Sequence, residues 1–344
     1  MVDVSQRAMT KRGNMTKTRV ALLTKRPQHN AIRLAALQEI AAKNNLLEIV
    51  VADLEQEPGE IIAAFQSARI LIAPNIKPTN SIAAKLPDLK LLQTFSAGTD
   101  QLDLALLLQH GIEVANNGGA NAVSVAEHAI MLMLTINHKF DLQIESVKDG
   151  KWMKGVTGAL SEYTSMVDRQ VGIIGLGRIG SRVAQRLRGW ECSVVYSDIV
   201  DFDTGYESAV GAKRMPLDQL IATSDYISLH VPLDRFTYHM MSTVQFKAMK
   251  NSAVLINTCR GSVVDEAALV DALKNGEIWG AGLDVTEVEP TPPDNPLITM
   301  PNVVITPHLA TRVIQSEWNA DMNAVENAER IAQGFKPNWI VDPV

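Results

Sequence analysis

The segment GIIGLGRIGSRVAQRL, residues 172–187, decides the fold class of this 344-residue chain. It contains Gly175, Gly177 and Gly180 in the spacing G-x-G-x-x-G, directly after an apolar run that predicts a strand and at the start of a stretch with helical spacing. The next predicted strand ends at Asp198, eighteen residues after Gly180. The glycine turn, the helix and the acid together predict a βαβ unit that binds a dinucleotide.

The residue types in this segment suit each part of such a ligand. The glycines permit a tight turn, and the amides of Arg178 and Ile179 at the helix N-terminus would meet the pyrophosphate. The Asp198 carboxylate would accept hydrogen bonds from the adenosine ribose hydroxyls. It would also repel a 2′-phosphate, which neither Ile199 nor Val200 neutralises, so we expect NAD rather than NADP. The alternative is a packing turn followed by a solvated aspartate.

Apolar runs alternate with helical segments on both sides of the motif. From Gln170 onward, the runs VGII, CSVVYSD, YISLHV, AVLIN, GAGLDV and NVVITP predict a doubly wound parallel sheet of six or seven strands. From Arg19 onward, the runs VALLT, LEIVVADL, ILIAP, LKLLQTF and IEVAN predict a second parallel unit that closes near Asn121. The fold class is therefore expected to be α/β with two domains, which the chain length also favours.

Two long helices are predicted outside this alternation. The first, AVSVAEHAIMLMLTIN at residues 122–137, would bridge the two domains. The second, RVIQSEWNADMNAVENAERIAQG at residues 312–334, is amphipathic and follows the last strand. A single helix cannot bury its apolar face alone, so we expect the second one to pack back on one of the domains.

Composition argues against several classes of protein. The net charge of −6 disfavours nucleic-acid binding, which needs a basic face. The apolar run 129–136 is too short to span a bilayer, and the polar residues 1–18 lack the apolar core of a secretory signal. Cys192 and Cys259 have no metal-ligand or redox spacing, so we expect reduced thiols, no metal site and a cytoplasmic location.

Arg260 lies in NTCRGSVVDEAAL, residues 257–269, just after the apolar run 253–256. A guanidinium stays charged at physiological pH, so its place at the tip of a buried strand costs desolvation unless it meets an anion. A structural ion pair and a ligand carboxylate both meet this requirement.

Several motifs resemble those of a known family. GLGRIG with its acid, SLHVPL, NTCRGSVVDEAAL, GAGLDVTEVEP and ITPH occur in the order and at spacings similar to those of the D-isomer-specific 2-hydroxyacid dehydrogenases. FSAGTDQLDLALLLQHGIEVANN and SVAEHAI extend the likeness over nearly the whole chain. The resemblance implies two doubly wound parallel-sheet domains: a Rossmann NAD-binding domain, residues 122–310, inserted into a flavodoxin-like substrate domain, residues 19–121 and 311–344. Residues 1–18 would be a disordered tail.

The resemblance implies three catalytic residues. Arg260 would hold the substrate carboxylate, His308 would donate or accept the proton, and Glu289 would be the carboxylate partner of His308. These roles suit the chemistry, because hydride addition to a 2-oxo acid places negative charge on the carbonyl oxygen, where a positioned acid lowers the barrier. The implied activity is NAD-dependent hydride transfer to or from C2 of a small D-2-hydroxy or 2-oxo acid related to glyoxylate, hydroxypyruvate or pyruvate.

The resemblance assigns further residues to the two ligands. Ala97 and Gly98 would offer backbone amides to the substrate carboxylate, beside Arg260 and His308. It also implies a homodimer, in which KDGKWMKG, residues 148–155, reaches across to the partner. Besides the glycine turn and its acid, the residues expected to contact the cofactor are Val231, Pro232, Thr237, Thr258, Cys259, Asp284 and Ala310.

Two alternative functions stay open. A non-catalytic NAD-sensing corepressor of the C-terminal-binding-protein type resembles these enzymes, and formate dehydrogenases carry glutamine where Glu289 stands, so the acid disfavours the latter. The stretch LATRVIQSEW, residues 309–318, departs from the family pattern and leaves the choice of substrate open. The histidines expected to be surface residues or satisfied core residues are His29, His110, His128, His138, His230 and His239.

Overall fold

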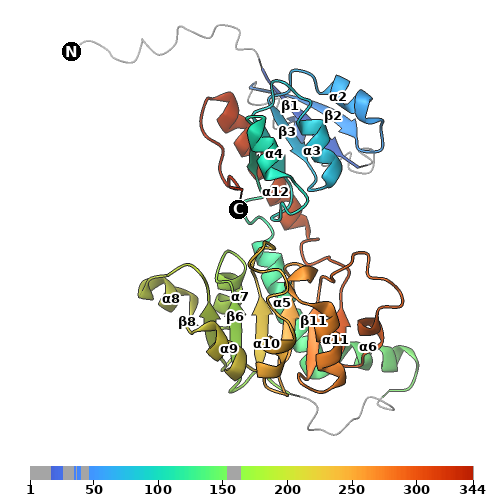
Figure 1. Ribbon diagram of the computed structural model, residues 1–344, viewed down its shortest axis with the longest axis vertical. Coiled ribbons are helices and arrows are strands. Elements are labelled where there is room, and N and C mark those ends of the chain that lie inside the picture. The colour runs from blue at the N-terminus through green and yellow to red at the C-terminus, as the bar shows by residue number, and fades with distance from the viewer. Residues whose placement is uncertain (1–16, 26–34, 36, 40–45, 153–163, 344) are drawn as a thin grey trace, which may run out of the picture. The chain divides into compact units, whose positions relative to one another are not determined.

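The computed structural model describes residues 17–25, 35, 37–39, 46–152 and 164–343. They form two compact units (Figure 1): one takes in the chain up to Ala120 and from Glu317 onward, and the other is Asn121–Ser316. The second unit is thus an insertion in the sequence of the first. The tail predicted for residues 1–18 lies outside the described residues apart from its last two, and the second of these already begins a strand.

The first unit is built on a five-stranded sheet in the order β2-β1-β3-β4-β5, and every pairing is parallel. This is the flavodoxin-like order and confirms the predicted fold class. The strands are β1 (Thr18–Thr24), β2 (Leu47–Asp53), β3 (Ile70–Ala73), β4 (Leu91–Thr94) and β5 (Glu113–Ala115). The helices with described bounds in this unit are α2 (Pro58–Ala64), α3 (Lys77–Ala83), α4 (Leu104–Gln109) and α12 (Ile314–Ala332), whose first residues belong to the second unit. Residues 35 and 37–39 are also helical.

Both faces of this sheet are buried, because successive side chains of each strand enter different cores. Leu23 and Leu71 join a cluster with Phe65 and Leu107 from the α2 and α4 regions. Their neighbours along β1 and β3 join a second cluster that includes Val325 of α12. Burial on both faces explains why the strands are apolar runs rather than alternating ones. The final helix therefore packs back on a domain, as the sequence predicts.

The second unit contains a seven-stranded parallel sheet in the order β12-β11-β10-β9-β6-β7-β8. Counted from its first strand, the order is 3-2-1-4-5-6-7, the Rossmann arrangement with one added strand. The strands are β6 (Gln170–Ile174), β7 (Ser193–Ser197), β8 (Lys213–Arg214), β9 (Tyr226–Leu229), β10 (Val254–Asn257), β11 (Gly280–Leu283) and β12 (Val303–Ile305). The sequence predicts all of them except β8, whose two residues are exposed and give no apolar signal.

Helices cover this sheet on two sides (Figure 1). One apolar cluster joins the sheet to α5 and α7, and another joins it to α10 and α11. No helix in the described part of the chain has both the length and the hydropathy needed to cross a bilayer. The helices are α5 (Ala122–His138), α6 (Phe140–Lys148), α7 (Gly180–Leu187), α8 (Thr204–Val210), α9 (Leu217–Thr223), α10 (Thr243–Ala248), α11 (Glu266–Lys274) and two 3-10 turns, η4 (Gly261–Val263) and η5 (Pro296–Thr299).

Parallel strands all end at the same edge of the sheet, and this property positions the functional residues. The loops that follow β6, β7, β9, β10, β11 and β12 therefore meet at the carboxyl edge of the second unit. The strand order reverses between β6 and β9, and open α/β sheets bind ligands at such a switch point. Almost every residue that the sequence assigns to the cofactor or to the chemistry lies on one of these loops.

Candidate active site

The glycine turn after β6 leaves space that a nucleotide would need. Gly175 has φ +93°, and a Cβ there would lie 2.6 Å from the carbonyl oxygen of His230. A Cβ on Gly180 would lie 2.1 Å from the oxygen of Gly175, so both positions require glycine. A Cβ on Gly177 would meet no protein atom within 4 Å, so the turn borders open space there. At the start of α7 the N–H groups of Ser181 and Arg182 already donate to the carbonyl oxygens of Gly177 and Ile179, so the amides expected to meet an anion are those of Arg178 and Ile179 in the turn itself.

Asp198 lies directly after β7, and its carboxylate is held by two backbone amides. Its Oδ2 accepts from the N–H of Leu176 at 2.6 Å, and its Oδ1 accepts from the N–H of Val200 at 2.9 Å. The acid is therefore tied to the glycine turn. Arg214 of β8 also lies here: its guanidinium donates to the carbonyl oxygens of Asp198 and Val200 and pairs with Asp201. The sequence does not reveal this arginine, because sheet pairing rather than chain order brings it near.

Two buried polar atoms at the ends of β9 and β10 have no hydrogen-bond partner among the described residues. They are Nδ1 of His230 and Oγ1 of Thr258. The His230 Nε2 lies 2.9 Å from the Ser228 hydroxyl, and burial lowers the pKa of the imidazole to about 3, so the ring is neutral. A polar ligand group at this edge would satisfy both atoms, which fits a dinucleotide. The sequence analysis expects His230 to be a surface residue or a hydrogen-bonded core residue. Only its Nε2 has a hydrogen-bond partner among the described residues.

The other residues predicted to contact the cofactor lie on the same loops. Thr237 closes the turn after β9: its hydroxyl donates to the carbonyl oxygen of Pro232 at 2.7 Å, and Val231 packs beside the glycine turn. Cys259 follows β10 and is buried, and burial raises the pKa of its thiol to about 11. Ala310 is buried after β12. These residues shape the carboxyl edge of the sheet.

Asn257, the last residue of β10, organises the turn that carries Arg260. The buried Asn257 side chain accepts from the N–H of Cys259 at 3.0 Å and donates to the carbonyl oxygen of Arg260 at 2.9 Å. The Arg260 guanidinium donates to the carbonyl oxygen of Cys259 at 2.7 Å. The sequence analysis does not single out Asn257, whose role depends on this turn geometry.

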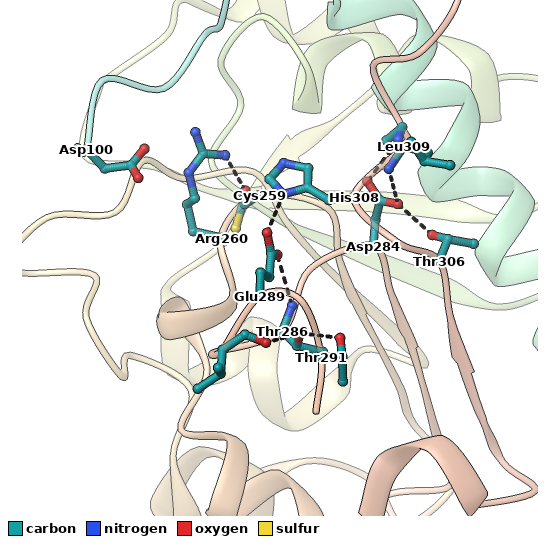
Figure 2. A network of polar contacts seen from close by, with 12 residues as sticks. Asp100, Cys259, Arg260, Asp284, Thr286, Glu289, Thr291, Thr306, His308 and Leu309 are labelled. Carbon is teal, nitrogen blue, oxygen red and sulfur yellow. Dashed lines mark hydrogen bonds and ion pairs between the residues drawn. The ribbon is translucent and has the colours of Figure 1, made fainter. Parts of the chain in front are cut away.

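His308 and Glu289 form a direct imidazole–carboxylate pair. The Nδ1 of His308 lies 2.7 Å from Oε2 of Glu289, and the other carboxylate oxygen accepts from the N–H of Thr286 at 3.3 Å (Figure 2). A carboxylate only accepts hydrogen bonds, so Nδ1 is the donor and Nε2 is the nitrogen left for a reaction partner. Arg260 lies near enough for its charge to act on both members of the pair.

The pKa values of the pair move apart. The hydrogen bond to Glu289 raises the pKa of His308 and outweighs burial and the charge of Arg260, which both lower it. Burial acts to raise the pKa of Glu289, but the hydrogen bond and the charge of His308 outweigh it and bring the pKa below its ordinary value. Near neutral pH the pair therefore favours a charged imidazole beside a charged carboxylate, which is suited to proton donation.

Asp284, immediately after β11, shapes the backbone that carries the imidazole. Its buried carboxylate accepts from the Thr306 hydroxyl at 2.6 Å and from the N–H groups of Leu309 and Ala310 at 3.0 and 2.9 Å (Figure 2). Its carbonyl oxygen accepts from the N–H of His308, whose φ of +53° is in the left-handed region. Non-glycine residues seldom adopt this conformation, so these hydrogen bonds hold the imidazole in place.

His128 reaches the same acid from α5. Its Nε2 lies 2.8 Å from the Thr306 hydroxyl and 3.4 Å from a carboxylate oxygen of Asp284. Burial lowers its pKa despite the nearby carboxylate. His128 is half-buried and hydrogen-bonded, as the sequence analysis expects of a satisfied histidine.

The structure brings Arg260, Glu289 and His308 together within the second unit, from loops that are far apart in the sequence. The predicted substrate residues Ala97 and Gly98 belong to the first unit, on the loop after β4. There the Ala97 carbonyl accepts from Asn116 at 3.2 Å, and the Gly98 carbonyl accepts from Ser96 at 2.7 Å. Among the described residues, no three His, Cys, Asp or Glu side chains gather in a way that could hold a metal ion.

Comparison with known proteins identifies the second unit. Residues 130–310 match the family described as D-isomer specific 2-hydroxyacid dehydrogenase, NAD binding domain. The matched segment contains the glycine turn, Asp198, Arg260, Glu289 and His308.

Two characterised relatives are more than one-third identical. A D-3-phosphoglycerate dehydrogenase of Archaeoglobus fulgidus is 36% identical over 267 residues, which are 77% of this chain but only 50% of the relative. A glyoxylate reductase of Korarchaeum cryptofilum is 36% identical over 256 residues, 74% of this chain and 77% of the relative. This chain is thus aligned to half the length of the first relative and to most of the second.

A solved structure has the same fold over nearly its full length. The D-mandelate dehydrogenase of Rhodotorula graminis superposes with a TM-score of 0.82 at 26% identity, covering 96% of this chain and 99% of that one. The three proteins are named for different acids, so the comparisons do not identify a substrate for this chain.

Proposed function

The chain belongs to the D-isomer specific 2-hydroxyacid dehydrogenase family, and we propose that it interconverts a small D-2-hydroxy acid and its 2-oxo acid. Residues 130–310 match the NAD-binding domain of that family. The observation that carries the proposal is the 2.7 Å contact between His308 and Glu289, with the charge of Arg260 close by. A proton donor and a carboxylate-binding cation are the two groups that reduction of a 2-oxo acid requires.

His308 is proposed as the proton donor in reduction and the proton acceptor in oxidation. Its Nε2 would face the C2 oxygen of the substrate, because Nδ1 is bonded to Glu289. Glu289 keeps the imidazole charged and in one tautomer, so that negative charge developing on the oxygen is neutralised as it forms. When bound, the cofactor would supply the hydride as NADH in reduction and accept it as NAD+ in oxidation.

Arg260 is proposed to bind the substrate carboxylate through its planar guanidinium. Two parallel N–H···O bonds would orient C2 of the acid as well as bind it. Ala97 and Gly98 are proposed to add backbone amides to the same carboxylate. Arg260 would then bind the carboxylate and His308 the C2 oxygen of the same substrate. Both residues lie on loops at the carboxyl edge of one sheet, where such a ligand would bind.

The glycine turn is proposed to receive the pyrophosphate, and Asp198 the adenosine ribose. The orphaned Thr258 hydroxyl supports a polar cofactor group at the end of β10. Asp198 and the backbone-engaged Arg214 support NAD over NADP, because a 2′-phosphate would meet a carboxylate while the nearest guanidinium already serves two carbonyl oxygens and Asp201. The two reduced cysteines support a cytoplasmic setting.

The test is an NADH oxidation assay with glyoxylate, hydroxypyruvate, pyruvate, phenylpyruvate and phosphohydroxypyruvate. Turnover of at least one acid, lost in the His308→Gln variant, supports the proposal. NADH binding without turnover of any acid would instead favour an NAD-sensing protein. The acid with the highest kcat/KM identifies the side chain that the substrate site accepts.

A homodimer is proposed on the apolar surface of α6 and its neighbourhood. Phe140 and Val147 of α6 are exposed by 53% and 54%, and Trp152 shortly after the helix is exposed by 72%, and large exposed apolar side chains suit contact with a partner. Analytical ultracentrifugation of Val147→Asp should then show monomers, whereas Leu108→Asp, an exposed leucine of the first unit, should sediment like the wild type. A monomeric wild-type protein would exclude the dimer.

A further inference from the structure

A second imidazole–carboxylate pair joins His239, on the segment after β9, to Glu287, on the loop that carries Glu289. The Nε2 of His239 lies 2.7 Å from Oε1 of Glu287, two residues before Glu289. Because a carboxylate only accepts, His239 is the donor. The two side chains are each somewhat over one-quarter exposed. None of the roles proposed above uses either residue.

Glu287 is bound on its other side to the start of α11. Its Oε2 accepts from the N–H of Glu266 at 3.3 Å, and its own N–H donates to the Glu266 carboxylate at 2.9 Å. Asn295 donates to the remaining oxygen of Glu266 at 2.7 Å. Each glutamate thus binds the backbone of the other, and the positive end of the helix offsets their like charges. Both the backbone and the side chain of Glu287 therefore hold this loop against the start of α11.

His239 joins this loop to the turn that follows Arg260. Its backbone N–H donates to the carbonyl oxygen of Ser262 at 2.9 Å, and the N–H of Met241 donates to that of Val263 at 3.2 Å. The imidazole stacks on the ring of Tyr238, with centroids 4.0 Å apart, and the φ of His239 is +51°. The backbone of His239 therefore bonds to the turn after Arg260, and its side chain bonds to Glu287 on the loop that carries Glu289.

The turn that carries Glu289 is itself held together by hydrogen bonds. The Thr286 N–H donates to the Glu289 carboxylate at 3.3 Å, and the Thr286 hydroxyl donates to the carbonyl oxygen of Val288 at 2.9 Å. Thr286 and Thr291 also share a hydrogen bond of 2.7 Å between their hydroxyls. A restraint on Glu287 is consequently a restraint on Glu289.

A close backbone contact completes the connection between the two turns. A Cβ on Gly261 would lie 1.9 Å from the carbonyl oxygen of Thr286 and 2.5 Å from the nitrogen of Glu287. The residue next to Arg260 therefore touches the peptide that precedes Glu289 in the same turn. The spacing between the guanidinium and the carboxylate depends on this contact staying closed.

We propose that His239 and Glu287 are positioning residues that hold the Glu289 turn against the Arg260 turn and thereby keep Glu289 in contact with His308. The expected change in kcat/KM rests on the proposed function, whereas the expected change in the contact between Glu289 and His308 does not. The charged groups that act on His308 are Glu289, Arg260 and Asp284. Glu289 lies two residues after Glu287 in the same turn, whereas Asp284, at the start of that loop, is held by its own hydrogen bonds to Thr306, Leu309 and Ala310.

The experiment compares His239→Leu and Glu287→Gln with His239→Gln, whose amide can still donate to Glu287. His110→Gln, at an exposed histidine of the first unit, is the matched control. The first readout is an NMR titration of the histidine rings in the full chain, with the His308 signal assigned from its loss in His308→Gln. The second is the pH profile of kcat/KM for the best 2-oxo acid, together with NADH affinity from fluorescence.

The expected result is a His308 titration that moves to lower pH in His239→Leu and Glu287→Gln, and stays at the wild-type position in His239→Gln and in the control. At alkaline pH the first two variants should lose kcat/KM by roughly five- to tenfold, with NADH affinity unchanged. Unchanged His308 titration in both would overturn the inference. Should His239→Leu fail to fold, the contrast between Glu287→Gln and His239→Gln decides. A wild-type protein without turnover refutes the proposed function, while the NMR titration still tests the positioning role.

Discussion

The imidazole of His308 and the carboxylate of Glu289 meet at 2.7 Å, and each shifts the pKa of the other toward the charged form. His308 therefore stays protonated to a higher pH than an ordinary histidine, and Glu289 stays ionised to a lower pH than an ordinary glutamate. At a pH between the pKa of Glu289 and the pKa of His308, the imidazole is protonated and can donate a proton.

Replacing His308 by glutamine removes the proton donor and keeps the approximate size of the side chain. We expect kcat to fall by roughly two to four orders of magnitude, because general acid catalysis contributes about that much. NADH affinity should stay at the wild-type value, since the glycine turn and Asp198 are untouched. Wild-type turnover in this variant would remove His308 from the proposed chemistry.

Replacing Glu289 by glutamine removes the charge that raises the pKa of His308. Reduction needs the protonated imidazole, so its kcat/KM falls as the pH rises through that pKa, and in the variant this fall should begin at lower pH. At alkaline pH the loss should be roughly tenfold or more.

Oxidation of the hydroxy acid needs the neutral imidazole and should therefore extend to lower pH in the same Glu289→Gln variant. Steady-state rates in both directions over a range of pH test these opposite effects. If both profiles overlay those of the wild type, Glu289 does not control the protonation of His308.

Arg260→Lys retains the positive charge but loses the planar pair of N–H donors. We expect KM for the 2-oxo acid to rise by roughly tenfold with a smaller change in kcat, and Arg260→Ala to lower kcat/KM by roughly a hundredfold. An Arg260→Ala enzyme with intact kcat/KM would instead assign the guanidinium to a structural ion pair.

Asp198→Ser tests the choice of cofactor. Loss of the carboxylate removes the repulsion of a 2′-phosphate and the acceptor for the ribose hydroxyls, so the ratio of kcat/KM for NADH over NADPH should fall by roughly two orders of magnitude. Initial rates with the two cofactors measure this ratio. A ratio that stays unchanged would mean that cofactor discrimination lies elsewhere in the loop.

Gly261→Ala forces a methyl group into the carbonyl of Thr286, where the Cβ would lie at 1.9 Å. Pushing the two turns apart should destabilise the protein by about 1–3 kcal/mol and lower kcat. Gly59→Ala is the matched control, because a Cβ there meets nothing within 4 Å. Thermal unfolding and turnover of both variants measure the difference. Equal behaviour of the two variants would show that the turns tolerate separation.

The fold could be predicted from the sequence because strands buried on both faces leave continuous apolar runs, and eleven of the strands carry that signature. The exception, β8 at Lys213–Arg214, is an exposed two-residue strand that is defined only by its pairing with β7. The contact of Arg214 with Asp198 could not be predicted for the same reason, since only this pairing brings the two residues together.

The sequence could single out Arg260, Glu289 and His308 as candidates, because they lie in motifs that follow strands, and the structure shows that they lie near one another. The sequence could not single out His239. Its partner Glu287 is 48 residues away, and no local pattern distinguishes a histidine that meets a distant carboxylate from one that meets water. The same holds for His230, because its motif gives no sign that the buried Nδ1 lacks a partner within the described chain.

The amino-acid sequence by itself determined the order of strands and helices, the glycine turn and the residue types at the strand ends, because backbone conformation and burial follow from local periodicity. Only the tertiary structure decided which side chains face one another across the carboxyl edge, among them His308 with Glu289 and His239 with Glu287. The physical reason is that such contacts depend on loop paths and strand register, which arise from packing many residues that are distant along the chain.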